Sequence, residues 1–129
     1  MVAWPRGGPQ ASIESYRSEM RDAHAGYIAY VPIGAVKKGE ALAKTLQCSV
    51  CHGANLEGIG PVPSLAGRSP SYMARQLFDF QTGARRGLWS DLMKPIVAKM
   101  TAEDLVNISA YIASKTPPAA DVRQTARAN

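Results

Sequence analysis

The sequence has little cysteine, few aromatic residues and little charge. Only two cysteines occur in 129 residues, while aromatic residues make up 7% and charged residues 19%. Two cysteines cannot build a disulfide-rich scaffold, and no apolar run approaches the roughly 18 residues that a transmembrane helix needs. Disordered chains are usually more polar than this one, of which 46% is hydrophobic. The chain is therefore expected to fold as one domain with a modest core.

The sequence also lacks the alternation of apolar and polar residues that predicts a β-sheet, and it has no internal repeat. Apolar residues recur at helical spacing instead, which predicts an all-α fold. Helices are expected at 11–29 and 35–47, from Pro70 to just before Gly83, at 92–100, and from Thr101 to just before Pro117, with a loop at 53–67. Ser69 is the expected N-cap of the third helix, and Thr101 to Asp104 has the pattern of a capping box.

These elements predict three parts of the chain and the inner faces of two helices. Residues 1–34 are expected to be an extension or linker with a candidate helix, residues 35–116 the domain, and residues 117–129 a flexible tail. The inward residues are expected to be Tyr72, Met73, Gln76, Leu77 and Phe80 on the third helix, and Leu105, Ile108, Tyr111 and Ile112 on the last.

Both cysteines lie in one short motif, Cys48-Ser49-Val50-Cys51-His52. This C-x-x-C-H pattern is the attachment signature of c-type haem. Two thiols one helical turn apart can form thioethers to the two vinyl groups of one haem, and the adjacent His52 can then reach the iron. The motif therefore predicts one covalently bound haem per chain, which adds a large apolar body to a small core.

Two other uses of the cysteines fit less well. A redox-active C-x-x-C pair of the thioredoxin kind needs βαβ patterning, which the sequence lacks. A structural zinc site needs about four ligands. Only Cys48, Cys51, His52 and the distant His24 are available, and they match no familiar zinc spacing.

A sixth iron ligand has to come from a separate segment, and the candidates are Met20, Met73, Met93, Met100 and His24. Met73 and Met100 occur in patterns typical of core residues. Met20 and His24 lie on the first candidate helix, where exposure is expected. Met93 lies between an irregular segment and a proline, where a side chain can be aimed independently of a long helix, so the pattern favours Met93.

At this point the sequence resembles the class I c-type cytochromes, of the small bacterial periplasmic kind. The resemblance covers about residues 35–116. It is carried by Gly39, the haem motif with Gly53, the stretch Gly60-Pro61-Val62-Pro63-Ser64-Leu65-Ala66-Gly67-Arg68, the helix residues 72–80 with Gly83 and Arg85, the stretch Met93-Lys94-Pro95-Ile96-Val97-Ala98, and residues 105–114. It implies the cytochrome c fold, in which three to five helices wrap around one haem.

The resemblance also implies roles for particular residues. His52 and Met93 are the implied axial ligands of the iron, with Met100 as the main rival of Met93. The backbone carbonyl of Pro63 is expected to bond the second nitrogen of His52, and Pro61 is then an additional proline. The residues expected to hold the haem propionates are Arg68, Tyr72 and Trp89, although Trp89 suits packing at the haem edge equally well. Gly39 is expected where the first and last domain helices cross, facing Tyr111 or its neighbours.

The N-terminal residues carry no targeting signal, since residues 1–10 contain no apolar stretch of the kind that a secretory signal has. Haem attachment of this type normally happens outside the cytoplasm. We therefore expect a periplasmic protein whose signal was cleaved or removed. Residues 1–34 have no counterpart in the minimal fold; they are expected to cover the haem edge, to mediate dimer contacts, or to belong to a larger multihaem or fused protein.

The net charge of +5 is unevenly placed, because residues 61–100 hold six basic and two acidic residues, a local charge of +4. Nucleic-acid binding is not expected, because no docking motif accompanies this charge. The haem propionates offset part of it, and the remainder would attract an acidic redox partner. An ordinary solvated basic surface explains the same charge.

The sequence predicts a monohaem electron-transfer protein that is not an enzyme. With His52 and Met93 both on the iron, single electrons can be exchanged without binding a substrate. Two alternatives stay open: a haem-bearing domain or subunit of a larger dehydrogenase or oxidase complex, and a gas-binding or peroxidatic haem with an open sixth position. A haem with an open sixth position would give a high-spin spectrum.

Overall fold

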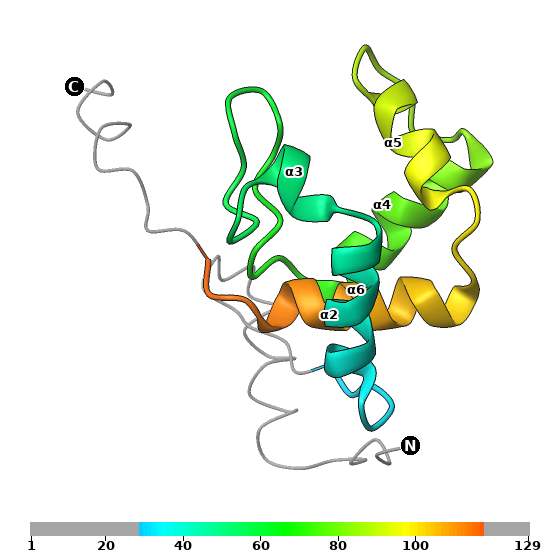
Figure 1. The fold of residues 1–129 in the computed structure, drawn as a ribbon. Coiled ribbons are helices and arrows are strands. Elements are labelled where there is room, and N and C mark those ends of the chain that lie inside the picture. The colour runs from blue at the N-terminus through cyan, green and yellow to red at the C-terminus, as the bar shows by residue number, and fades with distance from the viewer. Residues whose placement is uncertain (1–28, 118–129) are drawn as a thin grey trace, which may run out of the picture. The chain divides into compact units, whose positions relative to one another are not determined.

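The described part of the chain is helical. A computed structural model describes residues 29–117, and its helices are α2 (Ala35–Thr45), α3 (Cys48–His52), α4 (Pro70–Thr82), α5 (Ser90–Val97) and α6 (Ala102–Ser114) (Figure 1). Within this range the only β-type pairing is one isolated bridge between Ile59 and Val62. The predicted all-α fold is confirmed. None of the helices in residues 29–117 has the length and apolar character needed to cross a bilayer.

Within the described residues, one compact unit begins at Ala35 and contains all five helices. Residues 11–28 of the predicted first helix, with Met20 and His24, lie outside the described residues, as do residues 118–129 of the predicted tail. The division into an extension, a domain and a tail therefore stays a prediction.

The first domain helix ends earlier than predicted. Helical spacing continues to residue 47, but α2 stops at Thr45, and Gln47 adopts a left-handed backbone with φ of 55°. Few residues other than glycine adopt this conformation, and no glycine or proline marks the break in the sequence. The reversal turns the chain from α2 into α3, where the cysteine motif begins.

The α2 and α6 helices cross at very close range (Figure 1). A Cβ atom placed on Gly39 would collide with the backbone carbonyl of Asn107 and would lie 2.7 Å from Cβ of Tyr111. Beside the crossing, Lys38 forms an ion pair with Glu103 at 2.8 Å. The expectation that Gly39 faces Tyr111 and its neighbours is confirmed.

The predicted helix ends of α4 and α6 are present. The Ser69 hydroxyl accepts a hydrogen bond from the Tyr72 backbone N–H at 3.4 Å, and Gly83 ends α4 with φ of 75°. At the start of α6, the Thr101 hydroxyl accepts from the Asp104 N–H at 3.1 Å, and the Asp104 carboxylate accepts from the Thr101 N–H at 2.9 Å. These reciprocal bonds are the predicted capping box.

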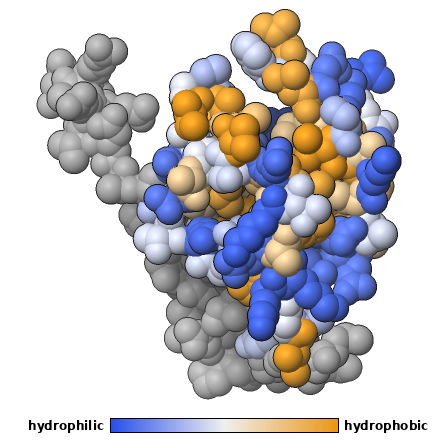
Figure 2. Space-filling model, viewed as in Figure 1, coloured by the Kyte–Doolittle hydropathy of each residue, from blue (hydrophilic) through white to orange (hydrophobic). Residues whose placement is uncertain are grey.

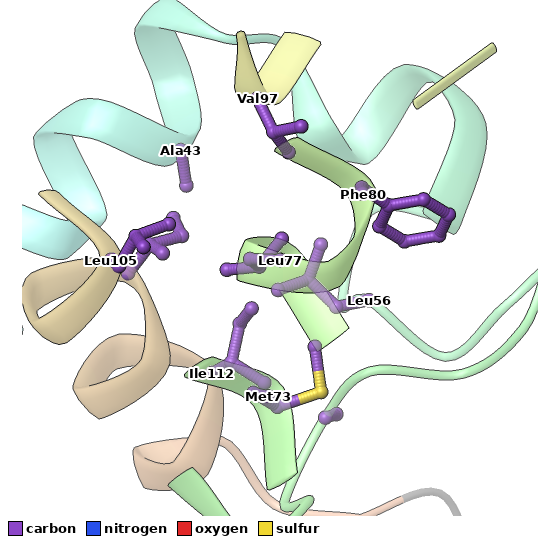
Figure 3. Close-up of a cluster of buried hydrophobic side chains, with 10 residues drawn as sticks. Ala43, Leu56, Met73, Leu77, Phe80, Val97, Leu105 and Ile112 are labelled. Carbon is purple, nitrogen blue, oxygen red and sulfur yellow. The ribbon is translucent and has the colours of Figure 1, made fainter. Parts of the chain in front are cut away.

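The core is built mainly from α4 and α6. Its buried residues are Ala43, Leu56, Ala66, Met73, Leu77, Phe80, Val97, Leu105, Ile108 and Ile112, and Figure 3 shows several of them converging between the helices. The inward assignment of Tyr72 is wrong, because this side chain is 48% exposed. Gln76 and Tyr111, which were also expected to face inward, are half-buried. The buried residues of α4 follow the spacing 73, 77, 80, a narrower stripe than the one predicted, and Tyr72 lies beside it.

The fourth predicted helix is shifted toward the N-terminus. It was expected at residues 92–100, but α5 runs from Ser90 to Val97 and contains Pro95. Proline has no N–H, so the usual helical bond to the Asp91 carbonyl is missing. Because α5 has only eight residues, it depends on packing against its neighbours for its stability.

Candidate functional site

The α3 helix presents the two cysteines and the histidine on one short turn. Cys48 is half-buried and Cys51 is exposed, and both are free thiols. Burial raises the pKa of the Cys48 thiol. Residues three apart on a helix point to the same side. The two sulfurs therefore suit attachment to one shared group, as the motif predicts.

His52 is buried, with 6% of its surface exposed, and its ring is oriented by a loop bond. Its Nδ1 lies 2.8 Å from the backbone carbonyl oxygen of Pro63. A carbonyl can only accept a hydrogen bond, so Nδ1 carries the proton and donates it. Nε2 then has the free lone pair that an iron ligand needs. The predicted bond to Pro63 is present, and Pro61 plays no part in it.

The loop that places Pro63 is organised by a buried leucine. Leu56 has a left-handed backbone with φ of 58°, and its carbonyl accepts hydrogen bonds from the N–H groups of Leu65 and Ala66 at 2.8 and 3.1 Å. Gly58, with φ of 87°, donates its N–H to the His52 carbonyl at 2.7 Å. The roles of both residues were missed from the sequence. A left-handed leucine has no local signature, whereas Gly58 could have been noticed as a glycine that precedes the two prolines.

The methionine candidates are placed differently. Met73 is buried in the core, as its pattern predicted. Met93 on α5 and Met100 after α5 are both half-buried and contact the core cluster. Their burial does not separate them, so the choice of Met93 over Met100 stays a prediction. Met93 lies on the short helix α5, two residues before Pro95, and the segment that precedes this helix is irregular.

The three side chains predicted to hold propionates are all exposed. Arg68 donates from Nε to the Ser64 carbonyl at 2.6 Å, which fixes its guanidinium against the loop. Tyr72 lies in the first turn of α4, and Trp89 directly precedes α5 and is 60% exposed. No hydrogen bond or ion pair joins these three described side chains to one another, and their roles stay predictions.

Apolar surface surrounds the site. Large hydrophobic side chains that are more than half exposed include Ile59 in the loop after α3, and Leu88, Trp89 and Leu92 at the start of α5. Figure 2, viewed as Figure 1, shows orange surface on both sides of a hollow between that loop and α5. Such exposed apolar surface on a small domain marks a binding region. Its walls suit a flat apolar macrocycle, and the thiols and imidazole of α3 suit covalent attachment and iron ligation.

A metal site made by protein ligands alone is not formed in the described range. Nowhere in residues 29–117 do three or more His, Cys, Asp or Glu side chains come together as metal ligands. The zinc site considered as an alternative would need about four such ligands.

Comparison with known proteins identifies the family of this chain. Residues 36–116 match the family described as Cytochrome c. The chain belongs to the cytochrome c family. The resemblance to class I c-type cytochromes is thereby confirmed, and the cofactor is haem c, bound covalently in a C-x-x-C-H motif of the family's kind.

Two named relatives of this cytochrome are longer than it is. Cytochrome c4 of Thiocapsa roseopersicina is 37% identical over 100 residues, which cover 74% of this chain and 50% of the relative. The thiosulfate dehydrogenase electron acceptor of Stutzerimonas stutzeri is 29% identical over 119 residues, covering 91% of this chain and 50% of the relative. The chain thus spans about half the length of these two relatives.

Solved structures show the same fold in this family. The reduced recombinant cytochrome c4 from Pseudomonas stutzeri superimposes with a TM-score of 0.58 at 29% identity, over 73% of this chain and 55% of that one. Cytochrome c4 of Acidithiobacillus ferrooxidans gives a TM-score of 0.56 at 30% identity, over 66% of this chain and 52% of that one. The predicted cytochrome c fold is confirmed.

Proposed function

We propose that this cytochrome is a one-electron carrier with histidine and methionine as axial ligands, and that it catalyses no reaction by itself. The observation that carries the proposal is the bond from His52 Nδ1 to the Pro63 carbonyl. This bond fixes the tautomer of the ring, directs Nε2 away from the loop and increases the basicity of the ligand. An electron carrier gains from a ligand held this rigidly, because little has to move when the charge changes.

The second ligand is proposed to be the Met93 thioether on α5. When bound, haem c supplies an iron that alternates between the ferrous and ferric states. A soft thioether favours the ferrous state and raises the reduction potential relative to two histidines. Cys48 and Cys51 would hold the haem covalently. Ile59 and Leu92 would shield it from water. Its propionates would be neutralised or hydrogen-bonded by Arg68, Tyr72 and Trp89.

The absorption spectrum of the ferric holoprotein tests this ligand set. Methionine-ligated ferric haem has a weak far-red band. We expect this band in the wild type and in Met100→Ala, the matched control, and expect it to disappear in Met93→Ala. A high-spin wild-type spectrum, or rapid binding of carbon monoxide, would contradict the proposal and favour the open-site alternative.

The partners are proposed to be redox proteins with acidic surfaces, met in the periplasm. One relative is named as an electron acceptor of thiosulfate dehydrogenase, which illustrates such a role for that protein. Arg85, Arg86 and Lys99 are exposed basic side chains in the C-terminal half of the domain. Steering by these charges predicts that electron exchange with an acidic partner slows as ionic strength rises. If the rate of electron exchange does not depend on salt, the basic side chains form an ordinary solvated surface and do not steer a partner.

A second candidate function follows from the length of the relatives. Since the chain spans about half of the relatives named above, it can equally be the haem-bearing domain of a larger dehydrogenase or oxidase complex. The mass of the native haem protein and the number of haems per polypeptide distinguish the two candidates. One haem on a polypeptide of this size supports the free carrier, whereas a larger polypeptide or a stable complex with a dehydrogenase supports the domain.

A further inference from the structure

One side chain outside the haem motif ties α5 to the rest of the domain. Gln81, next to the last residue of α4, is half-buried, and its Nε2 donates to two backbone carbonyls, Val97 at 2.7 Å and Met100 at 2.8 Å. Carbonyl oxygens only accept hydrogen bonds, so both amide protons are used. A single side chain therefore joins the end of α4 to the end of α5 and to the link that follows it.

The two carbonyls belong to the segment on which the position of α5 depends. Val97 is the last residue of α5 and is fully buried, and its carbonyl also accepts from the Met100 N–H at 3.1 Å. Carbonyls at a helix end have no partner within the helix, and buried ones need a partner elsewhere. Gln81 supplies that partner at the point where α5 enters the core.

Outside its C-terminal end, α5 is held mainly by the buried Ser90 and by Met93, which packs against the core cluster. Among the described helices it packs on α4 alone. Its first half contains the highly exposed Leu92, and the Asp91 carbonyl there lacks the bond that Pro95 cannot donate. Its placement therefore depends on its C-terminal end, which Val97 and Gln81 anchor.

Met93 lies four residues before Val97, one helical turn away on the same face of α5. A hydrogen-bonded anchor at Val97 therefore fixes the position of α5 along its axis and its rotation about that axis. Both determine where the Met93 side chain points. The geometry points to Gln81 as a positioning residue that holds α5 so that the Met93 thioether stays on the iron. This inference rests on the proposed function, in which Met93 is the sixth ligand.

Competition with imidazole measures this effect directly. Free imidazole displaces a methionine ligand from ferric haem, and its apparent affinity increases as the methionine becomes easier to dislodge. Removing the Gln81 bonds in Gln81→Leu should tighten imidazole binding to the ferric holoprotein roughly tenfold, the effect of losing two neutral hydrogen bonds. The loss of the far-red band during the titration is the readout.

The matched control is Gln76→Leu. Gln76 lies on the same helix, but its amide oxygen accepts from exposed Arg85 at 2.8 Å, a hydrogen bond that does not involve α5. We expect its imidazole affinity to stay within twofold of the wild type. Gln81→Glu, which keeps the shape but puts a carboxylate against two carbonyls, should tighten imidazole binding at least as much as Gln81→Leu, and it carries the test if the leucine variant does not take up haem.

The two levels of the proposal fail in different ways. If Met93→Ala keeps the far-red band, the ligand assignment of the proposed function is wrong, and the role of Gln81 falls with it. If Met93→Ala loses the band but the Gln81 variants bind imidazole as the wild type does, only the positioning role is wrong. The positioning role is also wrong if Gln76→Leu tightens imidazole binding as much as Gln81→Leu does. A general loss of stability would then explain the effect of both substitutions.

Discussion

Gly39 of α2 lies so close to Asn107 of α6 that a single added carbon would overlap the Asn107 carbonyl. The contact sets the distance between the two helices, and Ala43 of the core lies one turn further along α2. The motif helix α3 follows directly after α2, so the crossing also determines where the cysteines stand. The absence of a side chain at Gly39 is therefore a structural requirement of the site.

The first prediction concerns this crossing. Gly39→Ala should destabilise the holoprotein by about 1–3 kcal/mol, because the new methyl group forces the helices apart. Helix propensity alone would predict the opposite sign, a gain of roughly 1 kcal/mol. Ala41→Gly on the exposed side of α2 measures that propensity effect in the same helix. Urea unfolding gives both values, and a stabilised Gly39→Ala would disprove the close contact.

The second prediction concerns the loop that aims the Pro63 carbonyl. A Cβ atom on Gly58 would lie 2.7 Å from the Ser64 backbone nitrogen, whereas one on Gly60 would meet nothing within 4 Å. Both glycines have positive φ, so alanine strains both. Only Gly58→Ala should move Pro63 away from His52. A less basic histidine ligand stabilises ferric iron less, so the reduction potential should rise, by up to about 60 mV.

Gly60→Ala is the control for that measurement. It should lower the free energy of unfolding through backbone strain and leave the potential at the wild-type value. Equal shifts of potential in both variants would mean that loop strain, and not the bond to Pro63, sets the potential.

The third prediction is a pH dependence of stability at the α2–α6 crossing. The hydrogen bond and charge of Lys38 lower the pKa of Glu103 below 4.5, and Glu103 raises the pKa of Lys38 above 10.5. For Glu103 the contribution to stability is present above its unfolded pKa and lost as pH falls through its folded pKa. For Lys38 it is present below 10.5 and lost as pH rises through the folded value.

Glu103→Gln should therefore be less stable than the wild type near neutral pH, and the difference should vanish in acid below the folded pKa of Glu103. The difference should also shrink at high salt, since the pair is exposed. In a Lys38→Met background the same substitution should have a much smaller effect. Thermal unfolding over this pH range provides the comparison, and a difference that persists in acid would assign the effect to Glu103 alone.

The fourth prediction concerns an unpaired hydroxyl in α6. Ser109 is buried, and within residues 29–117 its Oγ has no hydrogen-bond partner. Removing the hydroxyl in Ser109→Ala should stabilise the protein by about 1 kcal/mol, because an unsatisfied buried polar group is lost and helix propensity improves. Ser114→Ala, where the exposed hydroxyl donates to the Tyr111 carbonyl at 2.7 Å, should change stability little. A destabilised Ser109→Ala, measured by urea unfolding, would mean that the hydroxyl has a partner in solution.

Local chemistry made much of the domain predictable. The caps at Ser69 and Thr101 were found because a hydroxyl before a helix has a recognisable pattern. The stripe that includes Leu105 and Ile112 was found because burial on one side of a helix leaves a period of 3.6 residues. The exposed position of Tyr72 was not found, because the width of a buried stripe depends on which helices pack against it.

The sequence by itself determined the covalent chemistry of this protein: Cys48, Cys51 and His52 are adjacent along the chain, so their spacing alone specifies haem attachment. Tertiary structure decided what has to be brought together from distant segments. The reversal at Gln47, the left-handed Leu56 and the Gln81 bonds to Val97 and Met100 have no local pattern. The Leu56 and Gln81 bonds join segments that meet only in the folded chain, and they aim His52 and position the helix that carries Met93.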